Sequence, residues 1–219
     1  MPEILYRSSA AVVCVKPVGV NSQGESAADL PALLAAQLGV EEVYPVHRLD
    51  RAVGGVMVFA LTKKAAAALS AAVQNGGLQK EYLAVLSGRP EKETDTLTDL
   101  LFHDRTRNKT YVVKRQRAGV KQAVLDYHLL SAVEETDGTR SLVRVLLHTG
   151  RTHQIRVQFA SRRLPLVGDG KYGSKSNRCE TALWSYQISF PDPESGETVS
   201  CRSLPPMEYP WTLFERNLP

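Results

Sequence analysis

The sequence lacks the patterns that mark several common classes of protein site. Its three cysteines, Cys14, Cys179 and Cys201, are widely spaced, and neither a CxxC pair nor an HExxH motif occurs. Zinc sites and disulfide frameworks are therefore not supported, and we expect reduced thiols in a cytoplasmic protein without a metal or other cofactor. The N-terminus lacks the apolar core of a signal peptide. No apolar run approaches the roughly 18–20 residues that cross a membrane, so we expect no membrane association.

Internal repeats, low-complexity segments and a large net charge are also absent. Hydrophobic side chains make up 43% of the 219 residues, which is ample for a packed core and argues against a disordered chain. We expect one domain over residues 1–219, acting as a monomer. A formal net charge of +4 and a pI of about 9.0 are modestly basic, which suits an RNA partner without requiring one.

One short stretch holds the strongest candidate for a catalytic group. It reads Val46-His47-Arg48-Leu49-Asp50-Arg51, and a double glycine and an apolar run follow at once. This pattern indicates a buried strand, which places Asp50 on a turn that enters the core. The arginines on either side favour the charged carboxylate. A fixed carboxylate serves as nucleophile, general base or metal ligand, whereas the alternative is an ion pair in solvent.

Strand and helix signals alternate irregularly along the chain, and tight turns join several strands. This order predicts an α+β fold with a largely antiparallel sheet and helices packed against it. Helices are predicted from a cap at Ser26 to Gly39, from a cap at Thr62 to Gly76, and over 151–163. Strands are predicted at 10–15, 56–61, 80–86, 111–113, 124–131, 141–148, 183–190 and 198–201, with a hairpin turn at Asp137-Gly138.

Further motifs occur in a fixed order along the chain. His47-Arg48-Leu49-Asp50 is followed by Lys80-Glu81-Tyr82, by Gly150-Arg151-Thr152-His153-Gln154-Ile155-Arg156 and by Pro165-Leu166-Val167-Gly168-Asp169. Together with Lys16-Pro17-Val18-Gly19, these motifs resemble the signature of the RluA-type pseudouridine synthases, which isomerise uridine in RNA to pseudouridine. His47 and Arg151-Thr152-His153 favour this type over the related RsuA type, which usually carries a glycine before RLD.

The resemblance implies the pseudouridine synthase fold, a long mixed, mostly antiparallel sheet flanked by helices, with the active site in a central cleft. It implies an isomerase that acts on ribosomal or transfer RNA and needs no cofactor. The S4-like RNA-binding module that many relatives carry is expected to be absent, since no such module precedes Lys16. We therefore expect a stand-alone catalytic domain.

The resemblance also implies roles for individual residues. Asp50 is the catalytic carboxylate, Tyr82 lies against the target base, and Arg156 forms an ion pair with Asp50. Attack of Asp50 on the sugar at C1′ and attack on the base at C6 both fit a single carboxylate. The substrate-binding residues are expected to include His47, Arg48, Lys80, Arg151 and Ile155.

One departure from the family pattern follows Lys16-Pro17-Val18-Gly19. The family tends to continue to a histidine there, whereas this chain has Asn21-Ser22-Gln23. We expect the departure to affect contacts with bases around the target, not the chemistry.

The segment His103–Lys121 is strongly basic. It carries seven Lys and Arg side chains around Tyr111, against the single acid Asp104: Arg105, Arg107, Lys109, Lys114, Arg115, Arg117 and Lys121. Such a segment fits phosphate contact and base stacking, so Arg105, Arg107 and Lys109 are expected to bind RNA. The alternative is a solvated edge hairpin, where lysines prevent aggregation.

Two other functions stay open at this point. One is an RNA-binding or ribosome-assembly protein that has lost activity, although Asp50, Tyr82 and Arg156 are all retained. The other is an unrelated α+β enzyme that binds phosphate at the glycine-rich turn Gly168–Gly173, although this turn lacks the GxxxxGK[ST] spacing. Detection of pseudouridine after incubation with RNA separates all three.

Overall fold

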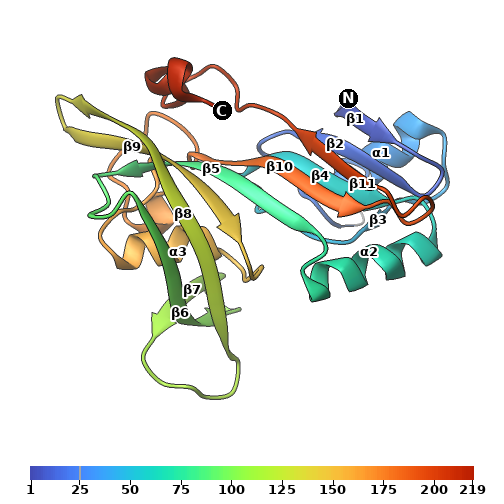
Figure 1. The fold of residues 1–219 in the computed structure, drawn as a ribbon, viewed down its shortest axis with the longest axis horizontal. Coiled ribbons are helices and arrows are strands. Elements are labelled where there is room, and N and C mark those ends of the chain that lie inside the picture. Colours follow the sequence, from blue (N-terminus) through green and yellow to red (C-terminus); the bar gives the residue numbers. More distant parts are fainter. Residues whose placement is uncertain (25) are drawn as a thin grey trace. The chain divides into compact units, whose positions relative to one another are not determined.

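A computed structural model describes residues 1–24 and 26–219 (Figure 1). These residues form a mixed, mostly antiparallel sheet of eleven strands with three α-helices and two 3₁₀ helices, so the predicted α+β class is confirmed. No helix among them is long and apolar enough to cross a membrane. The chain divides into a first unit (Met1–Glu81 and Trp184–Pro205) and a second unit (Tyr82–Leu183 and Pro206–Pro219). A single functional domain stays a prediction.

The first unit is built around strand β4, in which every residue is buried. Its strands are β1 (Glu3–Arg7), β2 (Ala11–Lys16), β3 (Tyr44–Pro45), β4 (Gly54–Ala60) and β11 (Thr198–Arg202), with β10 (Leu183–Pro191) from Trp184 onward. β2 pairs antiparallel with β1 and β4, β3 pairs antiparallel with β4, β10 runs parallel to β4, and β11 pairs antiparallel with β10. Four of these strands were predicted, whereas β1 and β3 were not.

The double glycine before the apolar run is required by the close approach of β10 to β4. A Cβ atom on Gly55 would lie 2.3 Å from the carbonyl oxygen of Ser185, and φ at Gly55 is +115°. A Cβ atom on Gly54 would lie 2.3 Å from the ring of Trp184. Because only glycine avoids these overlaps, the two glycines set the point where β4 begins.

Helix α2 (Lys63–Asn75) packs its buried residues against the sheet of the first unit. Ala65 and Leu69 belong to the same hydrophobic cluster as residues of β2, β4 and β10. The Thr62 hydroxyl accepts a hydrogen bond from the backbone N–H of Ala65 (3.1 Å), and Gly76 follows the helix with φ +81°. Both predicted ends of this helix are therefore confirmed.

Helix α1 (Leu30–Leu38) begins later than predicted. Its N-cap residue is Asp29, so the assignment of this role to Ser26 is wrong. The Asp29 carboxylate instead accepts a hydrogen bond from the backbone N–H of Ser26 (3.1 Å), which holds Ser26 in the turn before the helix. The predicted stop at Gly39 is confirmed by its left-handed conformation, with φ +66°.

The second unit contains the long antiparallel strands. They are β6 (Thr94–Asp104), β7 (Lys109–Val113), β8 (Val120–Glu135) and β9 (Gly138–Leu147), with β5 (Gln79–Ser87) from Tyr82 onward. β6 pairs with β7 and β8, and β9 pairs with β8. The turn between β8 and β9 lies at Thr136-Asp137, one residue earlier than the predicted turn at Asp137-Gly138. β6 was not predicted, and its buried Leu97 and Leu101 lie four residues apart on one face with Asp99 between them, which breaks the alternation of a half-buried strand.

Helix α3 (Gln154–Ser161) is shorter than the predicted helix over 151–163. Its N-cap residue His153 is left-handed, with φ +54°. The Gln154 side-chain oxygen accepts hydrogen bonds from the Thr149 hydroxyl (2.8 Å) and the Arg151 backbone N–H (3.0 Å), which holds the preceding residues in a turn. Every residue from Gln154 to Phe159 is buried. The remaining elements of this unit are the 3₁₀ helices η1 (Gly170–Tyr172) and η2 (Trp211–Asn217).

Candidate active site

Asp50 lies on a tight turn immediately before β4, as the sequence predicts. The carbonyl of Asp50 accepts a hydrogen bond from the backbone N–H of Val53 (3.0 Å), one residue before the strand. Leu49 on the other side is 6% exposed, so the turn is anchored in the core. The Asp50 side chain is partly exposed. A partly exposed carboxylate held on a rigid turn is suited to act as nucleophile or base.

A buried lysine supplies positive charge near Asp50. Lys16 is 0% exposed, and its ammonium donates hydrogen bonds to the carbonyls of Val20 (2.7 Å) and Pro17 (2.9 Å). Burial lowers the pKa of Lys16 to about 8, while the negative charge of Asp50 opposes this shift. The neighbouring Arg51 is exposed and donates its Nε–H to the Gly19 carbonyl (2.9 Å). Arg48 is also exposed.

His47 is tied to the central strand of the first unit. Its Nε2 accepts a hydrogen bond from the backbone N–H of Val58 in β4 (3.2 Å), which assigns the proton of the neutral ring to Nδ1. Burial lowers the pKa of His47 to about 3, and the positive charge of Lys80 contributes. Burial also lowers the pKa of Lys80. In the first unit, His47 is therefore bonded to β4 and lies near Lys80. Arg48 and Asp50 precede that strand in the chain.

In the second unit, Arg156 is held by a bidentate ion pair. Its Nε and Nη2 donate to the two carboxylate oxygens of Asp169 at 2.7 and 2.8 Å, and the side chains are 8% and 1% exposed. The guanidinium lies over the ring of Tyr172, 5.2 Å from the centroid. The Tyr172 hydroxyl accepts a hydrogen bond from the backbone N–H of Thr110 (2.8 Å) and lies 2.9 Å from Nδ1 of His153. This network orients the Arg156 guanidinium.

The other predicted residues of the second unit differ in their surroundings. Tyr82 and Ile155 are each 4% exposed, on β5 and α3. Arg151 precedes α3 and donates its Nε–H to the carbonyl of Gln122 (2.9 Å). A backbone partner gives Arg151 a structural role whether or not it also meets substrate.

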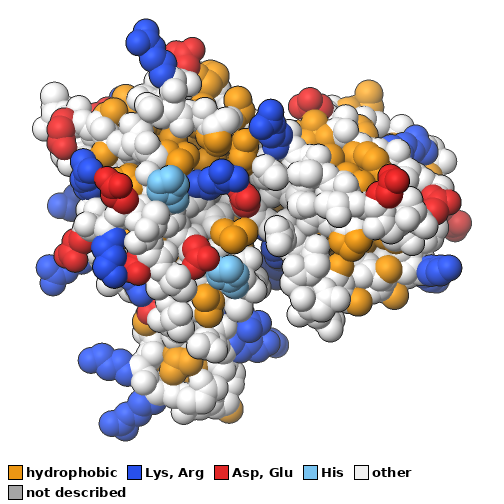
Figure 2. Space-filling model, viewed as in Figure 1, with side chains coloured by type: hydrophobic (Ala, Val, Ile, Leu, Met, Phe, Trp, Pro, Cys, Tyr) orange, Lys and Arg blue, Asp and Glu red, His pale blue; other side chains and the backbone are white. Residues whose placement is uncertain are grey.

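The basic segment includes strand β7, which forms a hairpin with β6. Figure 2 shows Lys and Arg side chains projecting into solvent at this end of the second unit. Arg105 and Arg107 are exposed in the turn between β6 and β7. Lys109 is half-buried, and its ammonium lies 5.4 Å from the centroid of the Tyr172 ring and 5.9 Å from that of Tyr111. Arg107 also forms an ion pair with Asp104 (3.8 Å). The segment therefore combines exposed cations with aromatic faces, a combination that fits nucleic-acid contact.

A model of the RNA pseudouridylate synthase family matches residues 10–161 of this chain. The chain belongs to this family.

Its relatives include synthases with different named substrates. An uncharacterized RNA pseudouridine synthase of Aquifex aeolicus is 33% identical over 237 residues, which cover 99% of this chain and 69% of that protein. Ribosomal large subunit pseudouridine synthase D of Neisseria meningitidis serogroup B is 33% identical over 90% of this chain and 56% of that protein. tRNA pseudouridine synthase C of Pasteurella multocida is 33% identical over 78% of this chain and 74% of that protein. The chain is therefore an RluA-type synthase, an isomerase that acts on RNA.

Solved structures confirm the predicted fold. Human RNA pseudouridylate synthase domain containing 1 superposes with a TM-score of 0.81, at 24% identity over 95% of this chain and 85% of that chain. Human RNA pseudouridylate synthase domain containing 4 gives a TM-score of 0.76, at 23% identity over 94% of this chain and 89% of that chain.

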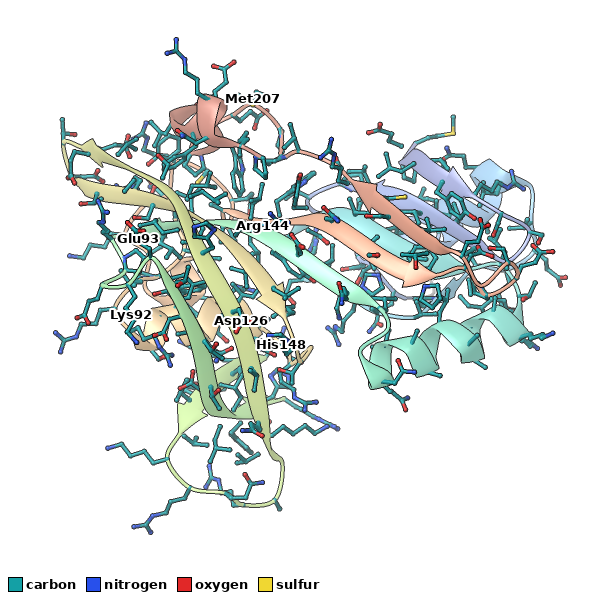
Figure 3. The ribbon with its side chains drawn as sticks, viewed as in Figure 1. Lys92, Glu93, Asp126, Arg144, His148 and Met207 are labelled. Carbon is teal, nitrogen blue, oxygen red and sulfur yellow. The ribbon has the colours of Figure 1, made fainter. Side chains whose placement is uncertain are left out.

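The synthase also contains a charged cluster that the sequence analysis missed. On β8, Tyr127 packs its ring against Phe159 of α3, so its neighbour Asp126 points to the opposite face of the sheet. The Asp126 carboxylate accepts a hydrogen bond from the Thr96 hydroxyl and lies near His148 Nε2, both at 2.7 Å, and these partners lower the pKa of Asp126 (Figure 3). The Asp126 and His148 side chains are more than 40% exposed, so the pair contributes little to stability.

Proposed function

We propose that this synthase isomerises specific uridines in ribosomal or transfer RNA, with Asp50 as the catalytic carboxylate. The observation that carries the proposal is the position of Asp50, which is partly exposed and lies on a fixed turn within the motif His47-Arg48-Leu49-Asp50. Relatives named for ribosomal and for transfer RNA support the two substrate classes.

The reaction explains why one fixed carboxylate is sufficient. Pseudouridine formation breaks the N1–C1′ glycosidic bond, rotates the uracil and rejoins it to the sugar through C5. The product is an isomer of the substrate, so no electrons are exchanged and no group leaves. The target base is shielded within a helix, so it must be extruded into the protein before Asp50 can reach C1′ or C6.

The remaining motif residues act around Asp50. Tyr82 stacks on the extruded uracil and assists removal of the proton from C5. Arg156 holds the Asp50 carboxylate through a charge-assisted hydrogen bond, the role that its motif implies. Its fixed guanidinium, paired with Asp169, supports this role because an oriented donor loses little freedom on binding. Arg48 is exposed, and it contacts the flanking phosphate or fills the space that the base vacates.

Binding of the RNA backbone is assigned to the basic hairpin with Arg105, Arg107 and Lys109. The exposure of Arg105 and Arg107 and the positive charge of all three side chains support contact with phosphates, which is independent of sequence. Substrate contact by His47, Lys80, Arg151 and Ile155 stays a prediction.

Asp50→Asn tests the proposal, because it keeps the side-chain shape and removes the charge and the nucleophile. We expect single-turnover pseudouridine formation to fall roughly 10⁴-fold or more, the scale on which removal of a central catalytic residue acts. RNA affinity should persist, because it comes mainly from Lys and Arg at phosphates.

Asp192→Asn is the matched control within the same unit. Asp192 is 2% exposed, and its carboxylate accepts hydrogen bonds from the hydroxyls of Tyr6 and Ser8. This variant should lose stability but keep its turnover rate per folded molecule. Substantial turnover by folded Asp50→Asn protein would remove Asp50 from the mechanism.

A further inference from the structure

A single buried hydroxyl forms hydrogen bonds with the backbone of the residue before Asp50. Ser22 is 3% exposed, and its Oγ donates a hydrogen bond to the carbonyl of Leu49 (2.8 Å). The same Oγ accepts a hydrogen bond from the backbone N–H of Leu49 (3.1 Å). Both backbone groups of Leu49 are thus satisfied by one side chain that lies 27 residues away in the sequence.

The residue after Asp50 is held by the same loop. The carbonyl of Arg51 accepts a hydrogen bond from the backbone N–H of Gly19 (2.8 Å), and the Lys16 ammonium lies 3.4 Å from that carbonyl. The loop is in turn fixed at its far end, where the Asn21 carbonyl accepts a hydrogen bond from the backbone N–H of Leu30 (3.0 Å).

These contacts act on the two peptide planes that meet at the Cα atom of Asp50. The Leu49 carbonyl belongs to the plane before Asp50, and it is held by Ser22. The Asp50 carbonyl belongs to the plane after it, and it is held by Val53. Since peptide units are planar, fixing both planes fixes φ and ψ of Asp50 and therefore the direction of its Cα–Cβ bond.

We propose that Ser22 is a positioning residue for the reaction: its hydroxyl sets the direction in which the Asp50 carboxylate points. This inference rests on the proposed catalytic role of Asp50. Ser22 lies within Asn21-Ser22-Gln23, the stretch that departs from the family pattern after Lys16-Pro17-Val18-Gly19. Its contribution is preorganisation of the carboxylate, since a misplacement of about 1 Å at a reacting group costs on the order of 100-fold in rate.

The test is Ser22→Ala, measured with Asp50→Asn in parallel. We expect the single-turnover rate of Ser22→Ala to fall about 10- to 100-fold, while the dissociation constant for RNA stays unchanged. The affinity is unchanged because the hydroxyl is buried and its contacts are with Leu49. Ser22→Thr keeps the hydroxyl and should recover most of the rate. Ser22→Cys has a weaker hydrogen-bond donor of similar size, so its single-turnover rate should lie between those of the alanine variant and the wild type. This variant provides the test if Ser22→Ala does not fold.

Ser185→Ala is the matched control. Ser185 is 1% exposed and donates its hydroxyl to the carbonyl of Val56 at the same 2.8 Å, but it lies on β10, outside the loop. Its loss should lower stability without changing the rate of folded protein. A rate for folded Ser22→Ala or Ser22→Cys within twofold of wild type, or an equal loss in Ser185→Ala, overturns the role of Ser22. If Asp50→Asn is inactive in the same series, the role of Asp50 survives that result; if Asp50→Asn turns over substantially, both fail.

Discussion

Asp169→Asn probes the buried ion pair that orients Arg156. Asparagine keeps the shape of the aspartate side chain and one carbonyl oxygen. It replaces the second carboxylate oxygen with an amide NH₂, which cannot accept a hydrogen bond. In the wild-type protein, that oxygen accepts a hydrogen bond from Arg156 at 2.7 or 2.8 Å. The arginine charge is then left without its partner in a site where the two side chains are 8% and 1% exposed.

The size of the effect follows from this burial. Removal of one partner of a buried pair costs about 3–5 kcal/mol, because the other charge stays desolvated without compensation. One retained hydrogen bond places Asp169→Asn near the lower value, about 3 kcal/mol. For a chain of this size, that loss lowers the melting temperature by about 6–12 °C.

Thermal and urea unfolding, followed by circular dichroism, measure this loss. Asp95→Asn is the control, because Asp95 pairs with Lys92 in solvent, with side chains 37% and 66% exposed, and should change stability by less than about 1 kcal/mol. The double variant Arg156→Met, Asp169→Leu removes both charges and should recover part of the stability, although not the activity. A loss below about 1 kcal/mol in Asp169→Asn would refute the view that this pair is desolvated and tightly held.

Two further predictions concern RNA binding and pH. Replacing Arg105, Arg107 and Lys109 with Ala should reduce the slope of log affinity against log salt by about 2–3, because fewer counterions are released. An unchanged slope would show that the hairpin does not bind RNA and is only a solvated edge. The variant Lys63→Ala, Lys64→Ala on α2, compared with the double variant Arg105→Ala, Arg107→Ala, controls for net charge. His47 has a folded pKa of about 3, below its unfolded value of about 6.5, so its stabilisation is present above pH 6.5 and is lost as pH falls toward 3. In acid titrations of the unfolding free energy, His47→Gln should flatten this decline, and an equally steep decline would show that His47 does not cause it.

Local chemistry explains the elements that were predicted from the sequence. Thr62 caps α2 through a hydrogen bond to a residue three positions on, and Gly39 and Gly76 end helices through their own backbone freedom. The apolar run that begins at Gly54 forms a buried strand because its side chains are stable only when they are removed from water. Such signals act over a few residues, so they are readable without knowledge of the tertiary partners.

The errors lie where two nearby side chains compete for the same backbone groups at the start of a helix. Ser26 has the chemistry of an N-cap residue, but the Asp29 carboxylate binds its backbone N–H and moves the start of α1. Likewise, Gln154 folds back onto Arg151 and delays the start of α3. Capping residues compete for the same donors, and the propensities of the competitors are too similar for sequence alone to rank them.

The sequence by itself determined the family, the α+β class and the position of Asp50 on a turn before a buried strand, because these depend on motifs and on hydrophobic patterning. Only the tertiary structure decided how the site residues are held. Buried Lys16 donates hydrogen bonds to backbone carbonyls, and Ser22 is hydrogen-bonded to the backbone of Leu49 beside Asp50. Arg156 forms an ion pair with Asp169. Each of these contacts joins residues whose identities are compatible with many partners. The selection among partners comes from desolvation, because a polar group buried by the packing of the chain must bond to whichever donor or acceptor the fold brings within reach.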